Sequence, residues 1–122
     1  MQPLSLRVAQ AGPVRIHYET AGGGEPLILL HGLWGSTRWW RKNTAFLAEH
    51  FQLFLADLAG FGRGRGQRFR LDEAADILLR WLDQLDLPPY NLMGHSMGGL
   101  VTVQGIEQAD LGNVVGALPL CG

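Results

Sequence analysis

Ser96 is the residue of this sequence best suited to nucleophilic chemistry, because it stands at the centre of the pattern Gly94-His-Ser-Met-Gly98. This G-x-S-x-G pattern is typical of a serine presented on a sharp turn between a strand and a helix. The residues before it read as a strand and those after it as a helix, which is the context that the pattern requires. We therefore predict that Ser96 is a catalytic nucleophile and not merely the N-cap of a helix.

The glycines of this segment explain how such a turn can form. A chain that reverses from strand to helix within a few residues forces the serine into strained dihedral angles, and Gly94 and Gly98 remove Cβ atoms where the turn is crowded. The Oγ atom of Ser96 would then lie at a helix N-terminus. There the backbone amide of Met97 can donate a hydrogen bond to an oxyanion, so we predict Met97 as one oxyanion-hole residue.

A second amide donor is expected from the segment His31-Gly-Leu-Trp-Gly35, which follows a short apolar strand. In an acyl-transfer site of this kind, the loop after that strand supplies the other hydrogen bond to the oxyanion. We predict that the backbone amide of Leu33 is this donor and that Trp34 lines the substrate pocket. His31 is interpreted as structural, since its imidazole can hold the loop; the alternative is that His31 and Trp34 only pack the loop.

The elements that must position these residues alternate between strands and helices. Val14, Ile16 and Tyr18 alternate with polar residues, which indicates a half-buried strand, and Leu27–Leu30 is a continuous apolar run typical of a strand buried on both faces. The expected strands are 4–8, 14–19, 27–30, 51–57, 90–93 and 114–120, the first two joined by a turn near Gly12, and the expected helices are 38–50, 71–85 and 97–108.

Two of these helices carry detailed predictions. Ser36 or Thr37 can cap the helix over 38–50, with Trp39, Phe46 and Leu47 on its inner side. The helix over 71–85 has an apolar face at helical spacing. That face comprises Leu71, Ala74, Ala75, Leu78, Leu82 and Leu85.

The order of the elements predicts an α/β fold. Strands that alternate with helices imply right-handed crossovers and a mostly parallel sheet with helices on both faces. We expect a single domain over residues 1–122, incomplete because the sheet is truncated after about its sixth strand. The last strand would then be an exposed apolar edge, which predicts possible self-association through it.

Composition excludes several classes of protein. The chain has 122 residues, 47% of them hydrophobic, and a net charge of −1, so it lacks the basic character expected of a nucleic-acid-binding domain. Its one cysteine, Cys121, cannot form an internal disulfide. We see no secretory leader and no apolar run of membrane-spanning length, and we expect a cytoplasmic protein with no membrane association.

Three blocks of this sequence resemble the α/β-hydrolase family, in its esterase and acyl-hydrolase branch. They are Leu29-Leu-His-Gly32, Asp57-Leu-Ala-Gly-Phe-Gly-Arg63 and Gly94-His-Ser-Met-Gly-Gly99. In the middle block, Asp57 and the glycines resemble the family's D-x-x-G-x-G loop beside the site, although Gly64 stands where members often carry serine.

The resemblance implies a reaction class. It is hydrolysis of a small-molecule ester or similar acyl substrate through an acyl-enzyme, without a metal or organic cofactor. The serine at position 96 argues against the haloalkane dehalogenase branch, which resembles this chain but has an aspartate there.

The sequence contains no acid and histidine able to complete a catalytic triad. In this fold the order is Ser, then Asp or Glu, then His, yet only Glu107 and Asp110 follow Ser96 as acids and no histidine follows it. The four histidines, His17, His31, His50 and His95, all precede the serine. We interpret His17 as lying on the polar side of an edge strand and expect the chain by itself to be nearly inactive.

Three alternatives remain open. The missing base favours a non-catalytic α/β-hydrolase-like protein that binds small apolar ligands or partners. A cofactor-free C–C lyase or haloperoxidase would use the same elbow. A truncated fragment without function is the third possibility.

Overall fold

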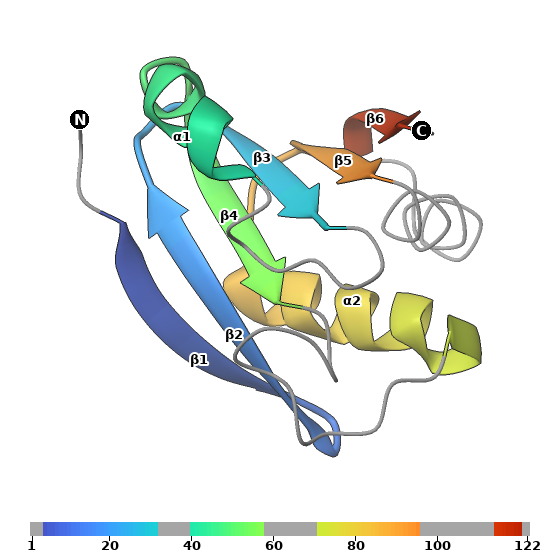
Figure 1. The fold of residues 1–122 in the computed structure, drawn as a ribbon. Coiled ribbons are helices and arrows are strands. Elements are labelled where there is room, and N and C mark those ends of the chain that lie inside the picture. Colours follow the sequence, from blue (N-terminus) through green and yellow to red (C-terminus); the bar gives the residue numbers. More distant parts are fainter. Residues whose placement is uncertain (1–3, 32–39, 58–70, 96–113, 121–122) are drawn as a thin grey trace.

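The computed structural model describes residues 4–31, 40–57, 71–95 and 114–120 (Figure 1). Its elements follow in the order β1 (Ser5–Ala11), β2 (Val14–Ala21), β3 (Glu25–Leu30), α1 (Arg41–Ala48), β4 (Phe51–Asp57), α2 (Leu71–Leu85), β5 (Tyr90–His95) and β6 (Val114–Leu120). All six predicted strands are confirmed, most of them longer than expected. The helix expected at 97–108 lies outside the described residues.

The strands form one six-stranded sheet in the order β1-β2-β4-β3-β5-β6. The four strands from β3 onward run parallel, and β2 pairs antiparallel with both β1 and β4. The predicted α/β fold with a mostly parallel sheet is therefore confirmed. The position of β2 between β1 and β4 corrects one expectation, because His17 lies on an interior strand and not on an edge.

The two helices cover opposite faces of the sheet. Side chains alternate between these faces along each strand, so neighbouring residues pack in different clusters. In β3, Ile28 and Leu30 pack in the cluster under α2, whereas Leu27 and Leu29 pack in the cluster that includes Ala48 of α1. All four side chains are buried, which explains the continuous apolar run of this strand.

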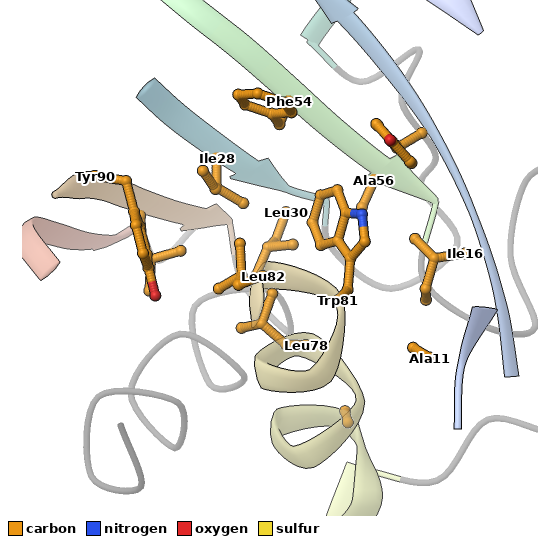
Figure 2. Packing of buried hydrophobic residues seen from close by; sticks show 13 residues of the cluster. Ala11, Ile16, Ile28, Leu30, Phe54, Ala56, Leu78, Trp81, Leu82 and Tyr90 are labelled. Atoms are coloured by element: carbon orange, nitrogen blue, oxygen red, sulfur yellow. The ribbon is translucent and has the colours of Figure 1, made fainter. Parts of the chain in front are cut away.

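Trp81 lies on the inner side of α2. It is the largest fully buried side chain among the described residues, with 1% of its surface exposed. Its ring lies 5.2 Å from that of Tyr18, measured between centroids, and Figure 2 shows it among side chains from several strands. The predicted apolar face is confirmed at Ala74, Leu78 and Leu82, which are buried, and at Leu85, which packs against the same cluster, but the prediction did not include this tryptophan. A large ring at this position ties α2 to β2 as well as to the central strands.

The α1 face differs from the prediction in three respects. The helix begins at Arg41, and its N-cap is Trp40, which makes no side-chain capping bond; the expected cap by Ser36 or Thr37 is therefore wrong for this helix. Phe46 is 65% exposed and does not form the inner side, which includes the buried Thr44 and Ala48. Leu47 packs against the same cluster as predicted, and Trp39 lies outside the described residues. The helix also ends before residue 50.

The polar side of β2 is buried in part, contrary to the simple alternation expected for it. Glu19 is only 4% exposed, although the pattern over 14–19 predicts a solvated position. Glu19 lies directly opposite Leu55 of β4, which belongs to the buried cluster on the α1 face, so its side chain is on a covered face of the sheet. Within the described part of the chain, no helix is both long and apolar enough to cross a membrane.

Candidate functional site

The segments that lead into the predicted site end side by side. β3 and β5 are neighbouring parallel strands, and their register pairs Leu30 with Gly94. The chain therefore enters the predicted oxyanion loop and the predicted nucleophile elbow from adjacent positions at the carboxyl edge of the sheet (Figure 1). This edge is where ligands bind in open α/β sheets.

Four predicted site residues stay predictions. Ser96, Leu33, Met97 and Trp34 all lie outside the described residues. What the structure describes is the pair of strands that would position them.

A row of four polar residues crosses the sheet at this edge. The register pairs His17 of β2 with Asp57 of β4, and Ala56 of β4 with Leu30 of β3. One residue further along both strands, Asp57 therefore neighbours His31. In the same way, the Leu30–Gly94 pair places His31 beside His95. We call His17, Asp57, His31 and His95 the polar row.

The members of the polar row share one face of the sheet. The residues two positions earlier in β4, β3 and β5 are Leu55, Leu29 and Met93, and all three belong to the cluster on the α1 face. Because side chains alternate along a strand, Asp57, His31 and His95 continue that face. His17 faces the same way, since a side chain directly opposite in an antiparallel pair lies on the same face.

The centre of the polar row is removed from water. His31 is 0% and Asp57 1% exposed, while His17 and His95 are half-buried. Burying a polar or charged group is costly unless it has a partner. His31, Asp57 and His95 each make a polar or ring interaction. The row is thus a polar layer, buried at its centre, between the apolar core and the carboxyl edge.

The sequence prediction treated the members of the row separately. His31 was expected to hold its own loop, and Asp57 was expected by resemblance to shape another. The sequence does indicate that His31 and Asp57 lie at the same edge of the sheet, because each directly follows a buried run of parallel strand. What the sequence lacked was the strand order, which makes β3 and β4 neighbours.

His50 lies at the opposite edge of the sheet. It directly precedes β4, whose seven residues lead to Asp57, and a strand of that length separates the two edges by about 20 Å. The ring of His50 contacts Phe46, with 4.9 Å between centroids. His50 is therefore too far from the carboxyl edge to act as a base there.

The described residues offer no metal site of the usual kind. In residues 4–31, 40–57, 71–95 and 114–120, no three His, Cys, Asp or Glu side chains are grouped so that they could hold a metal ion.

Comparisons with known proteins place the chain in a family. A family profile described as alpha/beta hydrolase fold matches residues 25–109. The acetyltransferase component of an acetoin cleaving system from Pseudomonas putida is 38% identical over 83% of this chain and 28% of its own length. The (E)-2-((N-methylformamido)methylene)succinate hydrolase of Acinetobacter baylyi is 33% identical over 70% of this chain and 34% of its own.

A solved structure agrees on the fold. The structure of epoxide hydrolase A from Mycobacterium thermoresistibile superposes with a TM-score of 0.81 over 96% of this chain and 39% of that one, at 20% identity. The chain spans about a third of the length of the two curated relatives. The matched region includes β3, β4, α2 and β5 together with the Gly94–Gly98 sequence motif, so the chain belongs to the α/β-hydrolase fold family.

Proposed function

We propose that this chain contributes the nucleophile and oxyanion hole of a serine hydrolase that cleaves carboxylic esters or similar acyl bonds. The observation that carries the proposal is the adjacency of β3 and β5, because it brings the segments before Leu33 and Ser96 to one edge of the sheet. The family membership supports a hydrolase. The names of the two curated relatives, an acetyltransferase and a hydrolase, are compatible with acyl chemistry.

The proposed reaction proceeds in two steps. The Oγ atom of Ser96 attacks the acyl carbonyl while a base takes its proton, and the amides of Leu33 and Met97 donate hydrogen bonds to the oxyanion. The alcohol leaves with that proton, and water then hydrolyses the acyl-enzyme. Trp34 contributes an apolar wall to the pocket. Because no histidine follows Ser96 in this sequence, the base and its acid come from residues outside it.

The test is made on the natural protein that contains this chain. p-Nitrophenyl esters of increasing acyl length are hydrolysed, and a fluorophosphonate probe is mapped by mass spectrometry. We expect the probe on Ser96 and a large loss of turnover in Ser96→Ala, about 10⁶-fold where the triad acts as a unit. Ser5→Ala is the matched control, since Ser5 is exposed on β1.

Three outcomes would contradict the proposal. Ester hydrolysis that survives Ser96→Ala would assign the activity to another nucleophile. An unlabelled Ser96 in a folded protein without esterase activity would favour the non-catalytic binding protein, and turnover of a C–C or halide substrate through Ser96 would favour the lyase or haloperoxidase.

A further inference from the structure

We propose that Asp57 is a positioning residue for the oxyanion hole, acting through His31. In this arrangement the buried carboxyl group fixes the imidazole of His31, and His31 fixes the start of the loop that carries the Leu33 amide. The inference rests on the proposed function, because it concerns how that site is held in place.

The first support is geometric. Asp57 has a histidine beside it on each side, His17 on β2 and His31 directly after β3. All three lie on the same face of the sheet, in which neighbouring strands are about 5 Å apart, and His17 lies directly opposite Asp57 in the antiparallel pair. The acceptor-only carboxylate thus stands between two rings that can each donate an N–H.

The second support is burial. Asp57 and His31 are 1% and 0% exposed, so the carboxyl group and the imidazole are both shielded from water. In such surroundings a hydrogen-bonded polar layer holds its members in one arrangement, because any alternative leaves a buried polar group without a partner. A half-exposed pair would be weaker and more mobile. Burial is therefore what makes this aspartate suited to orient its neighbour.

The third support is the place of His31 in the chain. It follows directly on β3 and precedes Gly32, so it leads directly into the segment predicted to be the oxyanion loop. On its other side, the register places it beside His95, the residue before Ser96. A displacement of His31 would thus reach both parts of the proposed site, and misplacement by about 1 Å can cost about 10²-fold in rate.

The experiment is a double-mutant cycle on the natural protein that contains this chain, with Asp57→Asn, His31→Asn and the double variant. Asparagine removes the charge of Asp57 with little change of shape. We expect each single variant to lower kcat about ten- to a hundredfold, with KM changed less than about twofold. The double variant should lose no more than the worse single variant, because residues that act as a unit are non-additive.

Two matched controls separate positioning from general damage. Asp83→Asn and His50→Asn repeat the same substitutions at exposed positions outside the polar row and should leave kcat unchanged. Active sites are counted with the fluorophosphonate probe, so a partly unfolded variant is corrected for its inactive fraction. Should Asp57→Asn fail to fold, His31→Gln and His17→Gln give the same comparison from either side of the carboxyl group.

A boronic acid that mimics the tetrahedral intermediate supplies a readout that a purely structural role would not move. Its inhibition constant should rise in Asp57→Asn in parallel with the fall in kcat. Unchanged kcat per labelled serine, or additive losses in the double variant, would overturn the positioning role while leaving Ser96 as nucleophile. If the unmodified protein showed neither labelling of Ser96 nor ester turnover, the proposed function itself would be overturned.

Discussion

A Cβ atom added to Gly22 would lie 2.3 Å from the carbonyl oxygen of Phe51. It would also meet the carbonyl oxygen of Ala48 at 2.6 Å. Gly22 has a φ of +83°, a conformation that residues with side chains rarely adopt. The turn between β2 and β3 therefore packs directly against the end of α1 and the start of β4, and only glycine allows this approach.

Gly22→Ala should consequently destabilise the protein by more than about 2 kcal/mol, since strain in the left-handed region adds to a clash with rigid backbone. Gly23→Ala is the control one residue away, because a Cβ there meets nothing within 4 Å. Chemical denaturation of both variants measures the difference. Equal unfolding midpoints for the two variants would show that the turn can move aside.

Because Trp81 is buried and Phe46 is exposed, truncating these two aromatic residues should change the free energy of unfolding by very different amounts. Trp81→Ala should lower the free energy of unfolding by about 3–5 kcal/mol, because it removes a fully buried ring and leaves a cavity under α2. Phe46→Ala should change it by no more than about 0.5 kcal/mol, since that ring is exposed. Thermal or denaturant unfolding of the two variants checks both values. A large loss in Phe46→Ala would contradict the arrangement of α1.

The burial of Tyr90 leads to a prediction of how the stability of the protein depends on pH in the alkaline range. Burial raises the pKa of its phenol above the ordinary value of 10.0, because the charged form is poorly solvated there. The unfolded chain therefore loses this proton at a lower pH than the folded one. The stabilising contribution of Tyr90 is fully present below pH 10 and is lost as the pH rises through the folded pKa.

The measurement compares denaturant unfolding of the unmodified protein and Tyr90→Phe at increasing pH above 10. The unmodified protein should lose stability more steeply, while all other titrating groups are common to both. Parallel curves would show that the phenol titrates alike in the folded and unfolded states.

The missing base predicts the activity of the 122-residue chain when it is made alone. Its hydrolysis of p-nitrophenyl acetate should not exceed the rate in water by more than about 10³–10⁴-fold, the level that binding and an oxyanion hole give without a triad. The comparison is with the natural protein that contains it, assayed identically. Robust turnover by the short chain, abolished by Ser96→Ala, would mean that one of its own histidines acts as the base.

Self-association through β6, the last strand in the described strand order, also stays a prediction.

The sequence by itself determined which segments are strands and helices and where the nucleophile motif stands among them. The α/β class followed from local patterns, such as the apolar run of Leu27–Leu30 and the helical spacing over 71–85. These signals are local, because the spacing of apolar residues within one segment reflects which of its faces are buried. The three sequence blocks carried the resemblance to the α/β-hydrolase family, which the family profile confirms.

Only the tertiary structure decided which of these segments are neighbours. The order that puts β4 between β2 and β3 brings Asp57 beside His31, and no pattern within either segment contains that information. The burial of Glu19, the exposure of Phe46 and the central position of Trp81 likewise depend on what packs against each residue. Periodicity reports that a face is covered, whereas long-range packing decides by what, and the polar row at the carboxyl edge exists only once the sheet is assembled.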